Sequence, residues 1–318
     1  MLTSKSANPI SPSSPSDPDV QVAAASLSPA RVWWLAVRPA TLAASVAPVL
    51  AGTAVAIHES GARPGAGIAA LVVAVAMQIG VNFANDYSDF VRGADSPRRV
   101  GPVRAASSGV VAPRQVMWAA IASFAVAAIA GVALCVTTDW RLLPVGAACL
   151  LAAWLYTGGP RPYGYFGLGE LFVFVFFGLV ATVGTAYVEE LRVTPLAVLA
   201  GCGLGFLASA ILILNNLRDI ESDTAAGKRT LATQIGRQPT RILLLVLVAA
   251  AFAVPIIILA TKLAGVTIML MHFGIPIAAV PVRTAFATSV GPPLVGALKR
   301  MAVAELAYAL LFTVGLLL

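Results

Sequence analysis

Charged side chains are scarce in this chain. Only 11% of its 318 residues are Asp, Glu, Lys or Arg, whereas an ordinary soluble protein has roughly 25%. With 59% hydrophobic residues and a mean hydropathy of +0.88, so few charges could not cover the surface of a water-soluble fold of this size. The composition argues against a soluble enzyme, a nucleic-acid-binding domain and a disordered chain. It predicts an all-α protein that spans a membrane several times.

Cysteine and histidine are equally sparse. Cys135, Cys149 and Cys202 all fall in apolar segments, with no CxxC pair and no histidine close by in the sequence. This pattern favours neither a zinc site nor a disulfide, and small apolar fillers are the simpler interpretation. His58 and His272 each stand alone, so we assign them no chemistry.

The first thirty residues differ in composition from the rest of the chain. They are rich in Ser, Pro and Ala and contain no long apolar run, whereas a secretory signal needs one. We therefore expect a disordered tail over residues 1–30 and a membrane domain over residues 31–318.

Nine apolar segments come near the length of about 20 residues that a lipid-crossing helix needs. The fourth of them is the weakest. The expected spans are Thr41–Ile57, Gly67–Ala84, Val116–Val136, Leu142–Thr157, Leu168–Val188, Leu196–Leu214, Ile242–Ala260, Gly265–Val282 and Ala302–Leu318.

The basic residues orient these spans. With nine spans, the N-terminal tail and every second loop share one side, which carries 17 of the 21 Lys and Arg residues. The other four are Arg63, Arg141, Arg192 and Lys262. Basic residues concentrate on the cytoplasmic side of cell-membrane proteins. The asymmetry therefore predicts a cytoplasmic N-terminus and an external C-terminus.

Six of the 14 acidic residues gather in two short stretches at the expected cytoplasmic ends of the second and sixth spans. The stretches are NFANDYSDFVRGAD and NNLRDIESD, and their acids are Asp86, Asp89, Asp95, Asp219, Glu221 and Asp223. Each stretch ends an apolar segment with Asn, continues with spaced Asp and runs into Gly and basic residues. The two stretches thus form a weak internal repeat.

The spacing of these residues indicates a metal site. Residues three or four apart share a helix face, so two polar stripes are expected, Asn82, Asp86 and Asp89 on one helix and Asn215, Asp219 and Asp223 on the other. Converging carboxylates repel unless a cation neutralises them, and oxygen ligands favour a hard ion such as Mg²⁺. The expected metal ligands are Asp86, Asp89, Asp95, Asp219 and Asp223.

Basic residues beside these acids suit a phosphorylated ligand, because Arg grips phosphate oxygens bidentately. We therefore predict a diphosphate held by Mg²⁺ at the cytoplasmic face. The expected substrate-binding residues here are Asn82, Asn85, Arg98, Arg104, Asn215, Asn216, Arg218, Lys228 and Arg229. A cation-coupled transporter remains an alternative, because intramembrane acids also bind transported ions.

The two acidic stretches, with GPVRAASSGVV, YTGGPRPYGYFGLGE and GKRTLATQIGR between and after them, resemble the UbiA-type superfamily of intramembrane prenyltransferases. Within it they are most similar to the 1,4-dihydroxy-2-naphthoate polyprenyltransferase branch of menaquinone biosynthesis. The superfamily pattern is often NxxxDxxxD. Here Asn82 and Asp86 keep the first interval and Phe90 occupies the next Asp position, which leaves Asp89 and Asp95 as alternative direct ligands.

The resemblance implies an Mg²⁺-dependent transfer of a polyprenyl group from an allylic diphosphate to 1,4-dihydroxy-2-naphthoate. Carbon dioxide and diphosphate would leave, and demethylmenaquinone would form in the cell membrane. The catalytic residues implied are Asp86, Asp89, Asp219 and Asp223. The same diphosphate site would also serve another aromatic acceptor, such as 4-hydroxybenzoate.

Some aromatic and acidic residues lie outside the two motifs. The candidates for holding the aromatic acceptor lie at the end of the fourth span and just after it, with interfacial anchoring as the alternative. They are Tyr156, Arg161 and Tyr163. The phenylalanines at 172, 174, 176 and 177 are expected to pack against lipid or neighbouring helices. Stabilisation of an allylic cation by their ring faces is the alternative. Glu170 is expected to be a favourable charge at a helix N-terminus.

Overall fold

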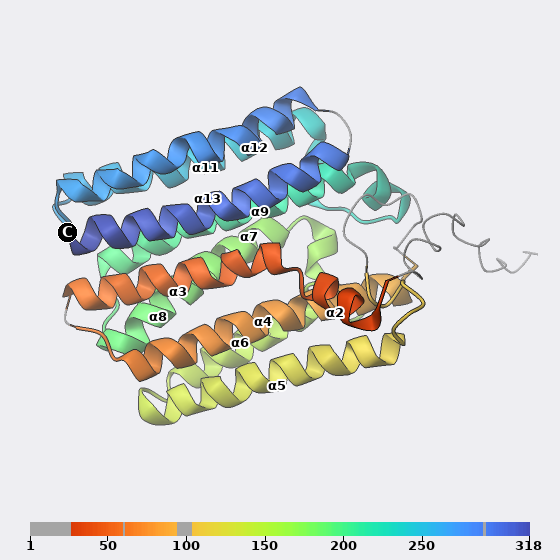
Figure 1. Cartoon of the computed structure of the whole chain (residues 1–318), viewed down its shortest axis with the longest axis horizontal. Helices are drawn as coiled ribbons and strands as arrows, with labels where there is room; N and C mark the ends of the chain where they lie inside the picture. Colours follow the sequence, from red (N-terminus) through yellow and green to blue (C-terminus); the bar gives the residue numbers. More distant parts are fainter. Residues whose placement is uncertain (1–26, 60, 94–103, 289–290) are drawn as a thin grey trace, which may run out of the picture.

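A computed structural model describes residues 27–59, 61–93, 104–288 and 291–318, which form helices and turns and no strand (Figure 1). The helices are α2 Pro29–Val37, α3 Pro39–Glu59, α4 Pro64–Val91, α5 Pro113–Thr137, α6 Leu142–Leu155, η1 Tyr163–Phe166, α7 Gly169–Val173, η2 Phe174–Val180, α8 Ala181–Glu190, α9 Pro195–Ala225, α10 Leu231–Ile235, α11 Arg237–Ala260, η3 Val266–Gly274, α12 Ile275–Ala287 and α13 Pro292–Leu317.

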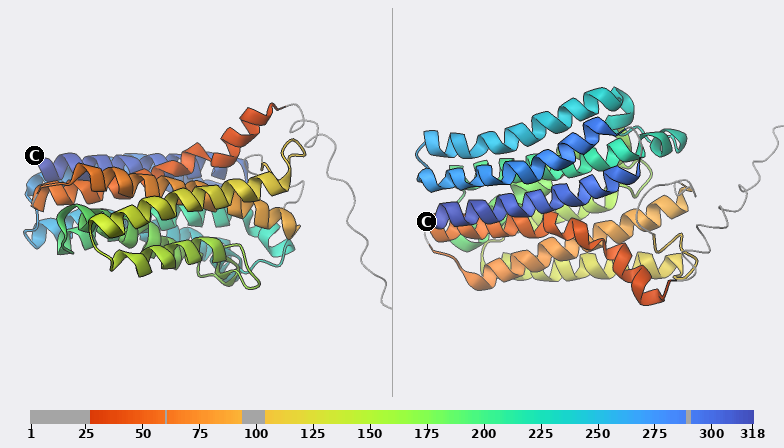
Figure 2. Two further views of the ribbon diagram at one scale, coloured as in Figure 1. Left: turned by 90° about the horizontal axis from the view of Figure 1, so that it is seen from below. Right: turned by 45° about the horizontal axis from the view of Figure 1, so that its top comes forward.

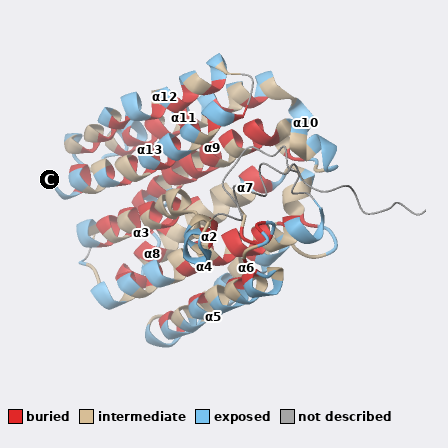
Figure 3. Ribbon diagram, turned by 45° about the vertical axis from the view of Figure 1, so that its right-hand side comes forward, coloured by how far each residue is buried: buried red, intermediate tan, exposed pale blue. Residues whose placement is uncertain are grey.

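The long helices lie roughly side by side in one bundle, and α3, α9 and α13 run through its middle (Figures 1 and 2). Helix α4 packs mainly on α5, α3 on α13, and α9 on α11. The C-terminus lies at one end of the bundle, whereas α2 and α10 lie at the other (Figures 1 and 3). We call the latter the α2 end.

The structure has eight helical stretches long and apolar enough to cross a membrane, of 22 to 31 residues each, among the described residues. Three of them combine consecutive elements: α2 with α3, α7 with η2 and α8, and η3 with α12. Helix α6, the weakest expected span, has only 14 residues. The prediction of a multi-span helical membrane protein is confirmed, and the count of nine spans stays a prediction.

Helix ends extend beyond several predicted boundaries. The helix α2 begins at Pro29, after a Ser28 cap, so residues 29 and 30 belong to the helical domain rather than to the expected tail. Residues 1–26 lie outside the described part of the chain. The second and sixth spans were expected to end at Ala84 and Leu214, but α4 continues to Val91 and α9 to Ala225. Both acidic stretches therefore lie largely on helices.

Proline is the first residue of six of the described helices. Its fixed φ suits the first helical position, where the missing N–H would have no helical acceptor. Hydroxyl side chains cap some of these starts, as where Thr194 Oγ1 accepts a hydrogen bond from the Ala197 N–H. The first-turn prolines of the long helices are Pro29, Pro39, Pro64, Pro113, Pro195 and Pro292.

Helix α9 is the most deeply buried of the long helices (Figure 3). Small residues let its backbone approach η2, because a Cβ on Gly178 would lie 2.3 Å from the Gly205 Cα and 2.6 Å from the Gly201 oxygen. Such close packing through small residues is typical of membrane helices. The π-helical segment η2 is thereby fixed against α9 and presents its opposite side to the cavity described below.

Candidate active site

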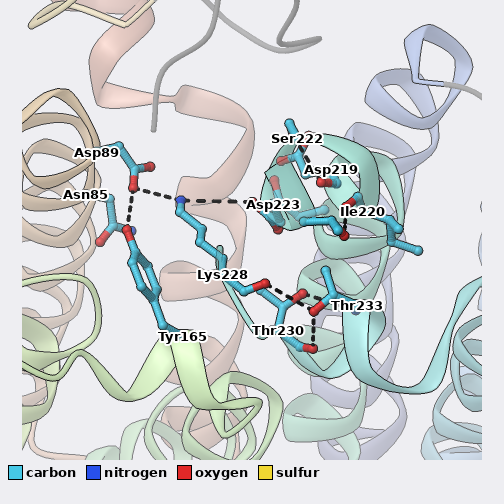
Figure 4. A network of polar contacts seen from close by, with 12 residues as sticks. Asn85, Asp89, Tyr165, Asp219, Ile220, Ser222, Asp223, Lys228, Thr230 and Thr233 are labelled. Carbon is cyan, nitrogen blue, oxygen red and sulfur yellow. Dashed lines mark hydrogen bonds and ion pairs between the residues drawn. The ribbon is translucent and has the colours of Figure 1, made fainter. Parts of the chain in front are cut away.

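The two acidic stretches meet across a polar cavity of about 80 Å³ at the α2 end of the bundle (Figure 4). The C-terminal parts of α4 and α9 supply its acids and amides. The segments that follow α6 and α9, together with Arg38 after α2 and Arg104 before α5, supply the rest of the wall. Its lining residues are Arg38, Asn85, Asp89, Arg104, Tyr156, Thr157, Gly164, Tyr165, Asn215, Asn216, Asp219, Ser222, Asp223, Lys228 and Thr230.

A larger apolar cavity of about 470 Å³ adjoins the polar one. Its walls come mainly from α3, α4, α5, α6, η2, α8 and α9. Four residues line both cavities, namely Arg38, Asn85, Tyr156 and Asn215. The site therefore joins a compartment suited to charged groups to one suited to a hydrocarbon chain.

Asp89 is the most heavily paired acid of the polar cavity. Its Oδ2 lies 2.5 Å from Arg104 Nη1, and its Oδ1 lies 2.8 Å from Lys228 Nζ. The Tyr165 hydroxyl donates a 3.1 Å hydrogen bond to the same Oδ1. The Asp89 side chain is only 5% exposed, so these contacts keep a buried carboxylate neutralised and hydrogen-bonded.

Lys228 connects the two acidic stretches. Its Nζ lies 3.9 Å from Asp223 Oδ1 while it contacts Asp89, so one ammonium stands between acids of α4 and α9 (Figure 4). The ammonium also lies 4.9 Å from the centre of the Tyr165 ring, on its face. This cation–π contact adds to the attraction of the two carboxylates.

The second stretch forms the stripe that its spacing predicts, because Asn215, Asp219 and Asp223 all line the polar cavity. Within it, Arg218 pairs with Asp219 at 2.5 Å and donates to the Asn215 side chain at 2.9 Å. Arg218 is buried but lines neither cavity, so its guanidinium orients these two residues from behind.

The first stripe is offset from the predicted one. Asn85 and Asp89, one helical turn apart, line the polar cavity, whereas Asp86 lines neither cavity and its Oδ2 accepts a 2.7 Å hydrogen bond from the Ala105 N–H. Asn82 lines the apolar cavity and donates to the Val37 carbonyl at 2.9 Å. The helix phase thus turns Asp86 toward the segment around residue 105.

The described acids do not form a ready-made metal cage. Among residues placed by the structure, no three His, Cys, Asp or Glu side chains gather closely enough to hold a metal ion. The donor chemistry nevertheless fits Mg²⁺, which commonly takes one or two carboxylates together with substrate phosphates. Asp89 and Asp223 already face one cation in common, the Lys228 ammonium.

The structure gathers most of the predicted substrate-binding residues and separates a few. Asn85, Arg104, Tyr156, Asn215, Asn216 and Lys228 line the polar cavity. Arg161 and Arg229 are exposed and line neither cavity. Asp95 and Arg98 lie outside the described residues.

Other cavity residues had no assignment from the sequence. Arg38 ends α2 with a φ of 55° and lines both cavities. Thr157 donates a 2.7 Å hydrogen bond to the Asn85 side chain, and Tyr165 contacts both Asp89 and Lys228. A lone Arg before an apolar run was the only sequence signal for Arg38, because its position depends on the break between α2 and α3.

Aromatic rings form a row that begins with Tyr156 at the junction of the two cavities and continues along the apolar cavity. The ring centroids of Tyr156 and Tyr163 lie 5.5 Å apart, and Tyr163 stacks on Phe172 with 4.0 Å between their centroids. The ring centroids of Phe172 and Phe176 lie 5.9 Å apart, and all four rings line the apolar cavity. Beside them, Phe177 also lines this cavity, whereas Phe174 packs on Phe206.

Glu170 lies in the first turn of α7, as expected of a helix N-terminal acid. The carboxylate is also buried and accepts a 2.9 Å hydrogen bond from Asn216 Nδ2. Because Asn216 lines the polar cavity, Glu170 fixes the orientation of a cavity amide. Its sequence position alone did not indicate this contact.

Burial also affects a tyrosine of the site. It raises the pKa of the Tyr165 phenol, and the neighbouring Asp89 carboxylate raises this pKa further. The Tyr165 hydroxyl therefore stays protonated near neutral pH and remains a hydrogen-bond donor.

The sequence is similar to several curated enzymes. It is 42% identical over 279 residues to the 1,4-dihydroxy-2-naphthoate octaprenyltransferase of Mycobacterium leprae (strain TN), covering 87% of this chain and 93% of that protein. It is 49% identical over 211 residues to the enzyme of that name from Mycobacterium tuberculosis (strain ATCC 25618 / H37Rv), covering 66% and 72%.

Solved structures share the fold. A UbiA homolog from Aeropyrum pernix K1 superposes with a TM-score of 0.67 at 16% identity, over 86% of this chain and 96% of that one. A UbiA homolog from Archaeoglobus fulgidus bound to DMAPP and Mg²⁺ gives a TM-score of 0.59 at 16% identity, over 89% and 99%. The UbiA prenyltransferase family model matches residues 45–291, and the chain belongs to this family.

Proposed function

We propose that this chain transfers a polyprenyl group from an allylic polyprenyl diphosphate to 1,4-dihydroxy-2-naphthoate, with loss of CO₂ and diphosphate, giving demethylmenaquinol, the reduced form of demethylmenaquinone. The observation that carries the proposal is the junction of the two cavities, where Arg38, Asn85, Tyr156 and Asn215 line both. An amphiphilic substrate with a charged head and a hydrocarbon tail fits this arrangement. The names of the bacterial relatives specify the acceptor.

In this proposal the polar cavity holds the diphosphate. Arg104, Lys228 and Arg38 supply positive charge, and the amides of Asn85, Asn215 and Asn216 supply further hydrogen bonds. Charge grows on the leaving diphosphate as the allylic C–O bond breaks, and fixed cations stabilise the developing charge. We further propose that the row of rings from Tyr156 to Phe176, which line the apolar cavity, stabilises the allylic cation.

Mg²⁺ is the proposed cofactor, held by Asp89, Asp219 and Asp223 together with the diphosphate. When bound, it supplies Lewis-acid stabilisation of the leaving group. The Archaeoglobus fulgidus structure with DMAPP and Mg²⁺ supports this for the shared fold. Asp86, which the sequence also predicts as a ligand, and Asp95 stay predictions.

The apolar cavity would exclude water from the cation while the ring attacks it. A carbon–carbon bond forms between the prenyl carbon and the naphthoate ring. The C–CO₂ bond then breaks and returns its electron pair to the ring. The acceptor-binding group of this proposal is Tyr156, at the junction of the cavities. Arg161 is exposed, which removes the structural support for its contact with the acceptor carboxylate.

The orientation is also proposed. The N-terminus and the polar cavity are placed at the cytoplasmic face of the cell membrane, because most basic residues of the sequence fall on the side predicted to hold the N-terminus, and Arg38, Arg104 and Lys228 among them line the polar cavity. The bilayer is the proposed surrounding of both substrates. Family membership gives the transporter alternative no support.

Product mass spectrometry tests the proposal. Membranes containing the protein receive Mg²⁺, a polyprenyl diphosphate and either 1,4-dihydroxy-2-naphthoate or 4-hydroxybenzoate. A prenylated naphthalene product lacking CO₂, absent when a chelator is added, is the expected result. A prenylated hydroxybenzoate alone would replace the acceptor, and no product from either acceptor would refute the proposed activity.

A further inference from the structure

We propose that Lys228 is an internal counterion, whose ammonium occupies the space between Asp89 and Asp223 until a divalent cation binds. The side chain then changes its conformation, and the ammonium contacts the diphosphate instead. The inference rests on the proposed function, because it concerns the same cavity. It assigns to one side chain a role that changes with the loading of the site.

The contacts of the ammonium carry the first step. Lys228 Nζ lies 2.8 Å from Asp89 Oδ1 and 3.9 Å from Asp223 Oδ1, so it contacts one carboxylate of each acidic helix (Figure 4). Through these two salt bridges, Lys228 links Asp89 of α4 to Asp223 of α9. A hard divalent ion that binds both carboxylates needs the space that this ammonium fills.

The backbone of Lys228 is fixed on both sides. Its N–H donates a 2.8 Å hydrogen bond to the Asp223 carbonyl, and its own carbonyl accepts one of 3.2 Å from Thr233 Oγ1. The preceding Gly227 has a φ of 70°, which closes the turn after α9. The side chain can therefore change partners through its own torsions, while the loop stays in place.

The second cation on Asp89 behaves differently. Arg104 contacts Asp89 Oδ2 at 2.5 Å and also donates a 3.2 Å hydrogen bond to the Asn85 carbonyl. Both contacts hold its planar guanidinium against α4, whereas lysine carries a compact charge on a flexible stem. This difference makes Lys228, and not Arg104, the group that exchanges.

Exchange serves the reaction in two ways. Without a metal, the ammonium offsets the repulsion between the acids of α4 and α9, so the cavity keeps its shape. With metal and substrate present, the displaced ammonium lies in the wall of the same cavity, where it adds a positive charge to the diphosphate.

Binding measurements give two effects of opposite sign. Removing the internal cation in Lys228→Met should raise the affinity for Mg²⁺ alone by at least about tenfold, because the ion no longer displaces a salt bridge. With Mg²⁺ present, the affinity for inorganic pyrophosphate should fall by at least about tenfold, because one phosphate-binding charge is missing. Both constants can be measured by titration calorimetry on the detergent-solubilised full chain.

Lys299→Met is the matched control. Lys299 is exposed on α13 and lines neither cavity, so this variant makes the same chemical change and loses the same charge. Both of its affinities should equal those of the wild type. Unchanged or weakened Mg²⁺ binding in Lys228→Met would overturn the counterion role, as would the same gain in Lys299→Met.

A measurement on the wild type guards against a misfolded variant. Acylation of lysine amines, read by mass spectrometry, reports how accessible Lys228 is, with Lys299 as internal reference. Saturating Mg²⁺ alone should increase labelling of Lys228, and added pyrophosphate should decrease it again. Labelling of Lys228 that does not respond to Mg²⁺ would refute the exchange.

These outcomes are separable from the proposed function. If the wild type forms the prenylated product and Lys228 shows neither response, the activity stands and the counterion role fails. If the wild type forms no product, the proposed activity fails, while the two affinities and the labelling still decide the role of Lys228.

Discussion

Replacement of Asp89 by Asn is the sharpest perturbation of the polar cavity. The carboxylate contacts Arg104 at 2.5 Å and Lys228 at 2.8 Å while only 5% of the side chain is exposed. Breaking a buried ion pair by removing one partner costs about 3–5 kcal/mol. The Asn amide would leave two cations without their shared counterion, and at least one of them would reorient.

We expect the loss to appear mainly in catalysis. If about 3 kcal/mol of this interaction is also needed in the transition state, turnover should fall by at least about 100-fold, since each 1.36 kcal/mol is tenfold in rate. The assay is formation of prenylated naphthoquinone per milligram of protein that elutes as a folded species. Helix content by circular dichroism should match that of the wild type.

Asp139→Asn is the control for this experiment. Asp139 follows α5 at the end of the bundle opposite α2 (Figure 1), where its carboxylate accepts a 2.5 Å hydrogen bond from the Tyr187 hydroxyl. It lines neither cavity, so its variant should keep activity within about twofold of the wild type. Activity of Asp89→Asn within about threefold of the wild type would show that this cavity is not the reaction site.

Three further predictions concern packing, metal and the phenol. Gly178→Ala should lower the melting temperature, because the new Cβ would lie 2.3 Å from the Gly205 Cα and overpacking costs about 1–3 kcal/mol. Gly184→Ala should leave the melting temperature unchanged, because a Cβ at this position has no neighbouring atom within 4 Å. A chelator should abolish product formation, and added Mg²⁺ should restore it; full activity in chelator would exclude the metal. Tyr165→Phe removes a hydrogen bond to Asp89 worth about 0.5–1.5 kcal/mol and should slow turnover up to about tenfold. Because the pKa of Tyr165 is raised, this bond is present below pH 10 and is lost only as the pH rises through the raised value. The ratio of the two rates should therefore stay constant below pH 10, and a change near neutral pH would contradict this.

The sequence predicted the membrane class and the family because both depend on local composition and motif. Residues four apart on one helix were enough to predict that Asn215, Asp219 and Asp223 share a face, and all three line the polar cavity. The same reasoning predicted Asp86 on the facing stripe, whereas its neighbour Asn85 lines the polar cavity. Spacing alone does not say which of two adjacent residues faces the partner helix.

Contacts between distant segments could not be obtained in this way. Lys228 and Asp89 are 139 residues apart in the sequence, and Tyr165 reaches Asp89 from the segment that follows α6. Arg38 enters the site only because the chain bends at its φ of 55°. Each contact depends on how helices pack, and an apolar periodicity does not encode which helices are neighbours.

The lengths of α4 and α9 explain how one site accepts both a charged and an apolar group. At 1.5 Å per residue their 28 and 31 residues measure about 42 and 46 Å, against a hydrocarbon core of about 30 Å. In the proposed orientation, the additional turns would carry Asp89, Asp219 and Asp223 beyond the most apolar depth, where a carboxylate costs less. The same two helices line the apolar cavity along their preceding turns. Because each helix is continuous, it holds the polar cavity and the apolar cavity in fixed register, and in the proposed function the bond between the head and the tail of the substrate lies at their junction.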